Sequence, residues 1–465
     1  MRKIGSSKGV MIKRLLFLAV LIALTLAFRY PYWINPTVFN SDHAVVGLQA
    51  LEILKGYRSW YLWGVGYQSS FEPFLTAIYY RLFGFSHHAL AVVGILGFVL
   101  VIISQYFVLL RWVVPSRSFL LCCFAIPSVM SITQITVFPP RIYSLTFMFL
   151  ACVLLNSRTR VLIALGAFVA FFSLYIDYYV IQLLPGVFFW GYFENKKNKD
   201  TFRAFGLGSG LGVLFLILCR LLRPEGGVPL AFSPKIFLKN VPLLWNEGLP
   251  ALFGYHSSLY NFGSLSNQWV WMAKVTAIIF LVLGIFSAIR LMSQRQYSHL
   301  AMVGVLGTVV SLLGFSGSSM ASDVHSVRYL GVICWLLPFT LLPVVQEMKA
   351  KFFWGLFPAL LIVWTLIGWN SYFPLVKNLR PVRTAQGNAE SETLLIEELR
   401  KQKVEVAAAD YWTSYRLSLL SFNRPIIVPN EEGRNRFWPY WDSFQSQANK
   451  IRISENPEGF KISQF

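Results

Sequence analysis

Long apolar blocks separated by short charged connectors dominate this 465-residue sequence and restrict its fold more than any other feature. Their lengths approach the ~20 residues that a helix needs to cross a hydrocarbon layer of ~30 Å. Only 13% of the residues are charged, whereas a soluble domain typically carries about 25%. That leaves too little polar surface for a water-soluble globule. The sequence therefore predicts a polytopic membrane protein and excludes a soluble enzyme, a disordered chain and a secreted disulfide scaffold.

The apolar blocks predict an all-α fold of about eleven transmembrane helices. The first block follows basic residues as a signal peptide would, but no small-residue cleavage site precedes Arg29, so we predict an uncleaved span. The predicted spans are Ile12–Phe28, Ala89–Leu110, Phe119–Ile135, Ile142–Leu155, Val161–Tyr175, Tyr178–Tyr192, Phe205–Leu222, Val275–Leu291, His299–Phe315, Tyr329–Val345 and Phe352–Trp369.

The formal net charge of +20 raises the question of an anionic partner. Basic clusters fall between every second pair of spans, as with Arg158 and Arg160, and also precede the first span. The positive-inside rule makes these clusters cytoplasmic and places the N-terminus inside. No RNA-binding motif accompanies them, so we exclude nucleic acid. We expect a multi-pass protein of a bacterial inner membrane, with membrane lipids as its surroundings.

Three segments face the outer side on this count: a first loop at 31–88, a second large loop at 223–274, and a tail at 371–465. Residues 1–370 form the predicted transmembrane domain. The tail is more polar than the rest and is predicted to be a small extracytoplasmic subdomain docked on the membrane part.

Secondary structure is predicted in two of the outer segments. In the first loop, Val45–Leu54 and Phe71–Phe83 are apolar but short, which favours helices lying at the membrane interface. In the tail, Glu390–Lys403 is a charged helix candidate, and Val404–Ala409 and Ile426–Val428 are short strand candidates. The tail is therefore predicted to be an α/β appendage.

Cysteine and histidine patterns predict neither a disulfide framework nor a zinc site. All five cysteines lie in apolar blocks, and the six histidines lack metal-ligand spacing. The cysteines are interpreted as small core hydrophobes. His43 stands out only because it follows Asp42, where it could hydrogen-bond that acid or an acceptor.

Acidic residues close to a membrane are informative because a carboxylate near hydrocarbon is costly without a partner or a use. Asp42 and Glu72 each open a predicted helix in the first loop. Both could simply cap their helices, and the local sequence slightly favours Ser41 or Asp42 as a cap. Glu52 is interpreted as a solvated residue. Two carboxylates about thirty residues apart, on helices that could fold together, point beyond capping.

The first loop resembles that of GT-C glycosyltransferases, which use polyprenyl-phosphate sugars, such as protein O-mannosyltransferases and aminoarabinose transferases. The similar strings are SDHAVVGLQA from Ser41, ILKG from Ile53, GYQSSFEPFL from Gly66 and LFGFS from Leu82. Arg328-Tyr329-Leu330 is similar to an Arg-Tyr-Leu that opens a late span in that family. The usual Asp-Glu pair is Asp42-His43 here, so a role that needs both acids, above all divalent metal binding, is in doubt.

This resemblance implies inverting transfer of a sugar from a polyprenyl-phosphate donor to a lipid, glycan or protein acceptor on the outer side. The implied catalytic residues are Asp42 as general base, with Glu72 as a second acid. No cofactor is firmly implied, and a divalent metal is left open. The implied substrate-binding residues are His43, Tyr67, Gln68, Arg141, Asp177, Arg220, Arg328 and Tyr329.

Alternatives remain for several of these residues and for the function. Each arginine at a span end could only reach toward lipid headgroups, and Asp177 could be a structural turn residue. The tail segment Tyr411–Arg416 could hold a glycan on its aromatic faces or simply pack against the membrane domain. The competing functions are a flippase or transporter of lipid-linked sugars and a glycan polymerase or ligase.

Overall fold

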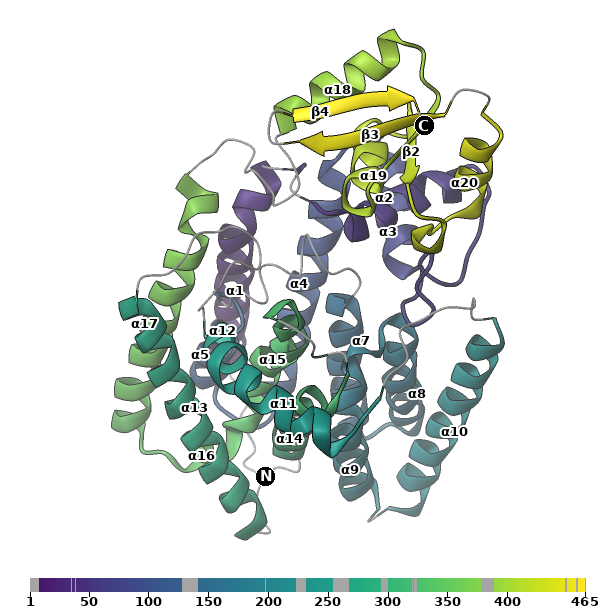
Figure 1. Ribbon diagram of the computed structural model, residues 1–465. Helices are drawn as coiled ribbons and strands as arrows, with labels where there is room; N and C mark the ends of the chain where they lie inside the picture. Colours follow the sequence, from purple (N-terminus) through teal and green to yellow (C-terminus); the bar gives the residue numbers. More distant parts are fainter. Residues whose placement is uncertain are drawn as a thin grey trace.

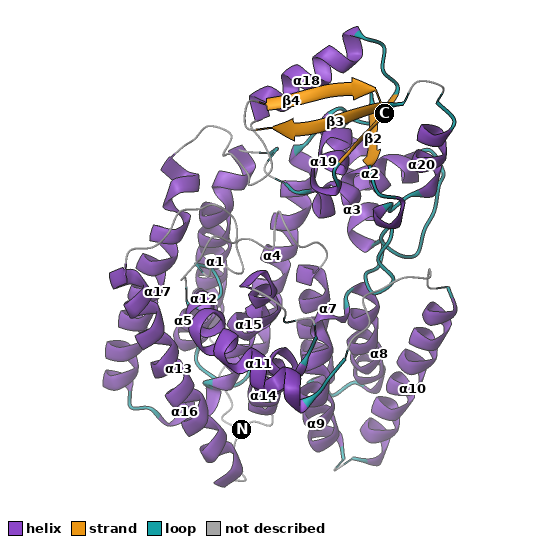
Figure 2. Cartoon of the chain, viewed as in Figure 1, coloured by secondary structure: helices purple, strands orange, loops and turns teal. Residues whose placement is uncertain are grey.

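The computed structural model describes residues 8–34, 36–37, 39–127, 141–196, 198–222, 231–253, 267–293, 300–319, 321, 324–377, 389–447, 450–456 and 459–464. It is a bundle of helices with a small sheet at one end, and in Figure 2 the strands are confined to that end. The helical elements before the tail are α1 (Lys8–Ile34), α2 (Ser41–Leu54), α3 (Phe71–Phe83), α4 (His88–Leu109), α5 (Pro115–Cys123), α7 (Arg141–Leu155), α8 (Arg160–Ile176), η1 (Tyr178–Leu183), α9 (Leu184–Asn195), α10 (Lys199–Leu221), α11 (Pro234–Leu243), η2 (Leu244–Gly248), α12 (Leu249–Leu252), α13 (Asn267–Ser293), α14 (Ala301–Gly317), η3 (Val324–Gly331), α15 (Val332–Thr340), α16 (Leu342–Glu347) and α17 (Ala350–Lys377).

The predicted fold class, an all-α polytopic membrane protein with a small α/β appendage, is confirmed. In the described part of the chain, six helices are long and apolar enough to cross a membrane, and three shorter apolar helices accompany them. The count of eleven spans stays a prediction. The predicted span Phe119–Ile135 coincides with α5 only at its start, and residues 128–135 lie outside the described residues.

Two predicted spans are interrupted rather than continuous. Tyr178–Tyr192 begins as the 3-10 helix η1 before continuing as α9. Tyr329–Val345 passes from the 3-10 helix η3 into α15 and then α16, with Pro338 inside α15 and Pro343 in the first turn of α16. Proline lacks the backbone N–H that a continuous helix needs, which explains the break near residue 341.

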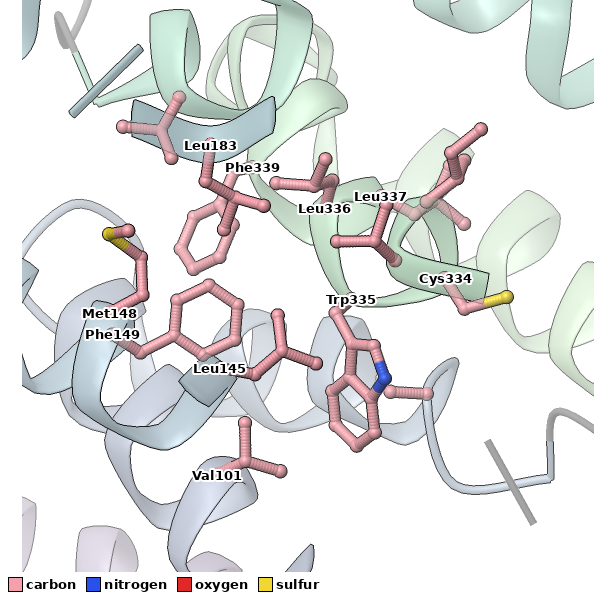
Figure 3. Close-up of a cluster of buried hydrophobic side chains, with 14 of the residues drawn as sticks. Val101, Leu145, Met148, Phe149, Leu183, Cys334, Trp335, Leu336, Leu337 and Phe339 are labelled. Carbon is pink, nitrogen blue, oxygen red and sulfur yellow. The ribbon is translucent and has the colours of Figure 1, made fainter. Parts of the chain in front are cut away.

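The core of the bundle lies where α4, α7, η1 and α15 meet. Figure 3 shows Val101 of α4, Leu145, Met148 and Phe149 of α7, and Leu183 of η1 facing Trp335, Leu336 and Phe339 of α15. All of these side chains are buried. This apolar contact fixes the start of α7 relative to η3 and α15. The start of α7 and η3 both carry residues of the site described below.

Close helix contacts depend on glycine at particular positions, and Gly208 of α10 is the clearest case. A Cβ built at this residue would lie 2.0 Å from the carbonyl oxygen of Ala164 on α8. The backbones of α8 and α10 therefore touch, as small residues commonly allow between membrane helices.

The tail forms a mixed sheet with helices packed on it (Figure 1). The strand order is β2-β1-β3-β4, in which β1 pairs parallel with β2 and β3, and β3 pairs antiparallel with β4. The predicted helix and both predicted strands are confirmed as α18, β1 and β2, whereas the sequence analysis does not predict the β3–β4 hairpin. The elements are α18 (Ala389–Lys401), β1 (Val406–Ala409), α19 (Tyr411–Leu420), β2 (Ile426–Pro429), η4 (Glu432–Arg434), α20 (Trp438–Gln445), β3 (Ile451–Asn456) and β4 (Gly459–Gln464).

The tail packs on the first loop through α19 and α2 (Figure 1). Both predicted first-loop helices are present as α2 and α3, and every residue from His43 to Glu52 of α2 is buried. Arg416 of α19 is buried, pairs with Glu392 of α18, and donates to the carbonyl oxygens of Thr37 and Phe39 just before α2. The chain segments before and within α2 are thus held by the tail.

Candidate active site

The start of α2 presents Asp42 to a cavity because another residue caps the helix. The side-chain oxygen of Asn40 accepts a hydrogen bond from the backbone N–H of His43 at 2.9 Å. The interpretation of Ser41 or Asp42 as the cap is therefore wrong: Ser41 donates to the carbonyl oxygen of Trp412. With the cap supplied by Asn40, the Asp42 carboxylate remains available for chemistry in the first turn.

Asp42 contacts two side chains that both come from the tail. The hydroxyl of Tyr411 donates a hydrogen bond to Oδ1 of Asp42, and Nη2 of Arg436 lies 3.1 Å from the same oxygen. Burial, together with the negative charge of Asp42, raises the pKa of Tyr411 well above its usual value, so its phenol stays protonated. Burial lowers the pKa of Arg436, but Tyr411 and Asp42 more than offset this and raise it, so the guanidinium stays charged.

A second pair of charges lies across the cavity, at the start of α7 and the end of α8. Nε of Arg141 is 3.7 Å from Oδ2 of Asp177, and both side chains are buried. Gln68 donates to the same Asp177 oxygen at 2.9 Å, while the other oxygen accepts from the backbone N–H of Tyr179 at 2.7 Å. The turn interpretation of Asp177 is thus correct, and the residue also orients Arg141 and Gln68.

The third wall comes from η3. The guanidinium of Arg328 lies 5.1 Å from the ring centroid of Tyr329 and donates to its hydroxyl at 3.3 Å. Arg141 also lies over the Tyr329 ring, at 5.2 Å. Both arginines therefore lie within cation–π distance of one aromatic ring.

These walls enclose a cavity of about 60 Å³. Burial raises the pKa of Tyr67, which therefore contributes a neutral phenol. Arg436, which the sequence did not predict, is one of the polar residues that line the cavity. The other six were predicted from the sequence: Asp42, Tyr67, Gln68, Arg141, Arg328 and Tyr329.

Four other predicted residues are not among the described residues that line this cavity, and one of them is Asp177, which contacts Arg141 and Gln68 as described above. Glu72 and His43 are buried between α3 and α2, with Nε2 of His43 3.6 Å from Oε1 of Glu72. Arg220 lies exposed in the last turn of α10. The structure thus gathers five of the eight residues predicted to bind substrate around Asp42, whereas the second predicted acid, Glu72, contacts His43 and does not line the cavity.

Glu52 differs from its sequence interpretation. The sequence predicts a solvated side chain, yet Glu52 is 9% exposed and accepts a hydrogen bond from the hydroxyl of Tyr440 at 2.8 Å, as well as one from Lys55. That interpretation is wrong because the tail covers this face of α2. The sequence left open whether the tail segment 411–416 packs against the membrane domain. Arg416 does pack there, in a buried pair with Glu392, whereas Tyr411 contacts Asp42.

A divalent metal does not fit the residues around this cavity. Among the described residues that line it, Asp42 is the one carboxylate, and three arginines share the walls with it. In the same part of the chain, no group of three or more His, Cys, Asp or Glu side chains is placed to hold a metal ion. Three nearby guanidinium groups would repel a dication, whereas they attract an anion such as a phosphate.

Comparison with solved structures shows the fold. ArnT from Cupriavidus metallidurans, in a crystal structure bound to undecaprenyl phosphate, is similar over 96% of this chain and 93% of ArnT, with a TM-score of 0.58 and 12% identity. Its apo crystal structure matches over the same shares with a TM-score of 0.55 and 13% identity. The arabinofuranosyltransferase AftD from Mycobacteria matches over 88% of this chain and 31% of AftD, with a TM-score of 0.47 and 15% identity. No protein-family model and no curated protein sequence matches the chain.

The similarity to ArnT extends over nearly the full length of both chains. The fold expected from the GT-C resemblance of the first loop is therefore confirmed over 96% of the chain.

Proposed function

We propose that this protein is an integral membrane glycosyltransferase that moves a sugar from a polyprenyl-phosphate carrier to a lipid, glycan or protein acceptor. The observation that carries the proposal is the cavity in which the Asp42 carboxylate lies among the cations Arg141, Arg328 and Arg436. Inverting transfer requires a base on one face of the sugar and an anion site for the leaving phosphate on the other, and the fold shared with ArnT, crystallised with undecaprenyl phosphate, supports the choice of carrier.

In this mechanism Arg141 and Arg328 hold the donor's phosphate. The acceptor's hydroxyl oxygen attacks the anomeric carbon, Asp42 takes the hydroxyl proton, and the bond from the anomeric carbon to the phosphate oxygen breaks. The carrier leaves as a phosphate monoester with one additional negative charge, which the arginines stabilise in a cavity partly shielded from water. Asp177 keeps Arg141 in place through the contact at 3.7 Å.

The positions of the first loop and the tail support a proposed orientation in the membrane. Both contribute to the cavity, which places them on the same side. With the positive-inside rule, we propose that this is the outer side of a bacterial inner membrane and that the N-terminus is cytoplasmic. Reporter fusions at Gly66 and after Asn370 should both be extracytoplasmic, and a cytoplasmic signal at either position contradicts this orientation.

The decisive experiment supplies vesicles that contain the protein with a labelled polyprenyl-phosphate monosaccharide. Label should appear on an acceptor, and Asp42→Asn should slow transfer by about 10²- to 10⁴-fold, because a general base contributes that much. Asp442→Asn, on the exposed face of α20, is the matched control and should keep the wild-type rate. Label that crosses the membrane without joining an acceptor supports a flippase instead.

A further inference from the structure

Arg436 is the tail's charged contribution to the cavity, and several contacts hold it there. Its Nη2 donates to the Tyr411 hydroxyl at 2.6 Å and lies 3.1 Å from Asp42, while Nε donates to Tyr411 at 3.1 Å. Its backbone N–H donates to the hydroxyl of Tyr415. The side chain is about one-fifth exposed, so one side of the guanidinium faces open space.

The first loop is shaped to accommodate Arg436. Gly64 has a φ of +66°, which favours glycine, and a Cβ at this position would lie 2.3 Å from Cδ and 3.3 Å from Cα of Arg436. Any larger residue here would push Arg436 away. At Arg436 the tail and the first loop therefore fit together in two places: where this arginine packs on Gly64 and where it pairs with Asp42.

Arg436 lies between two anions in the proposed reaction. One is Asp42, its present partner, and the other is the donor phosphate that the proposed function places beside Arg141 and Arg328 in the same cavity. A guanidinium has five donors in a planar fork and binds phosphate more strongly than a single carboxylate oxygen. A phosphate that enters the cavity therefore competes with Asp42 for this cation.

We infer that donor binding draws Arg436 from Asp42 to the donor phosphate and thereby releases Asp42 to act as the base. This inference rests on the proposed function and adds a positioning residue to it. Oδ1 of Asp42 accepts from both the Tyr411 hydroxyl and Nη2 of Arg436, so loss of the Arg436 contact leaves this oxygen with room for the proton of an acceptor hydroxyl. The Asp42 oxygen is then released only when a carrier phosphate occupies the cavity.

The lining of the cavity agrees with such a change. The cavity of about 60 Å³ is lined by Asp42 and by all three arginines, so a phosphate in it lies within the surroundings of Arg436. Arg436, Leu62 and Val65 form part of its wall, and Arg436 reaches it from the tail, 394 residues after Asp42. A shift of Arg436 away from Asp42 would widen the cavity on the side where the base must meet the acceptor.

Binding of undecaprenyl phosphate without a sugar tests the exchange independently of catalysis. The affinity would be measured by calorimetry on the full-length purified protein in detergent. Arg436→Gln should weaken binding about tenfold or more, because a charge-assisted contact is lost. Asp42→Asn should tighten binding about three- to tenfold, because it removes the competing anion. The double variant should bind like Arg436→Gln alone.

Arg434→Gln is the matched control, since Arg434 is exposed and pairs with Glu431 at the surface. It removes the same charge two residues away and should change affinity less than twofold. If Asp42→Asn leaves the affinity unchanged, or if the effects of the two single variants simply add in the double variant, the exchange is refuted. Should Arg436→Gln fail to fold, Arg436→Lys, which keeps the charge but loses the planar fork, takes its place in the same comparison with Asp42→Asn and the double variant. A wild-type protein that does not bind the carrier refutes the proposed function itself.

Discussion

The buried ion pair between Arg416 and Glu392 should hold the tail on the first loop, and removing its carboxylate tests this. Arg416 donates from Nε and Nη2 to the two oxygens of Glu392 at 2.6 and 2.7 Å. Its remaining donors reach the carbonyl oxygens of Thr37 and Phe39, immediately before α2. Glu392→Ala would leave the guanidinium buried against the first loop without its counter-charge.

The expected cost follows from burial. The side chains of Arg416 and Glu392 are 2% and 0% exposed, so neither group is solvated by water. Leaving one member of such a pair uncompensated costs about 3–5 kcal/mol. At 1.4 kcal/mol per factor of ten, the undocked population of the tail should rise by about two to four orders of magnitude. Replacing both charges, as in Glu392→Leu with Arg416→Met, should recover most of this loss.

Limited proteolysis measures the undocked population directly, because cleavage tracks the open form when opening and closing are fast. Cleavage within the tail would be followed by mass spectrometry for each variant. Glu398→Ala is the control: Glu398 lies on the exposed face of the same helix, where it accepts a hydrogen bond from Gln402. A cleavage rate for Glu392→Ala within threefold of the wild type would show that the pair does not hold the tail.

Two further predictions concern the bundle and the metal requirement. Gly208→Ala should destabilise the protein by about 1–3 kcal/mol, because the new Cβ meets the Ala164 backbone. Thermal unfolding in detergent measures this loss. Gly206→Ala is the control, because a Cβ there meets open space and should leave the unfolding temperature unchanged. EDTA should leave the rate of sugar transfer unchanged, since the described lining of the cavity has one carboxylate among three arginines, and a loss of activity restored by Mg²⁺ or Mn²⁺ would contradict this.

The sequence was most informative where local pattern determines structure. Apolar blocks located the helices, and the charged segment at 390–403 and the short apolar runs after it located α18, β1 and β2. The β3–β4 hairpin was missed although Ile451, Ile453, Phe460 and Ile462 alternate along it, a signal typical of strands.

Within the site, residues of the first loop and of the span ends were predictable, and in the tail the sequence pointed to the segment of Tyr411 but not to Arg436. Asp42 and Arg328 were found through short motifs, but nothing near Arg436 in the sequence distinguishes it from a solvated surface arginine. Its role depends on a contact across 394 residues. The same covering by the tail explains why Glu52 was misjudged, because only the fold shows that Tyr440 covers it.

The separation between Asp42 and Arg436 also has a consequence for biosynthesis. At about 5–20 residues per second, a ribosome needs about 20–80 s to add the 394 residues that divide them. The apolar helices from α4 to α17 enter the membrane during that interval, while Asp42 has not yet met its partner. The site is therefore completed only after the bundle has been inserted. A nascent chain halted before position 436 would be a membrane protein with its helices in place and its reaction centre unfinished.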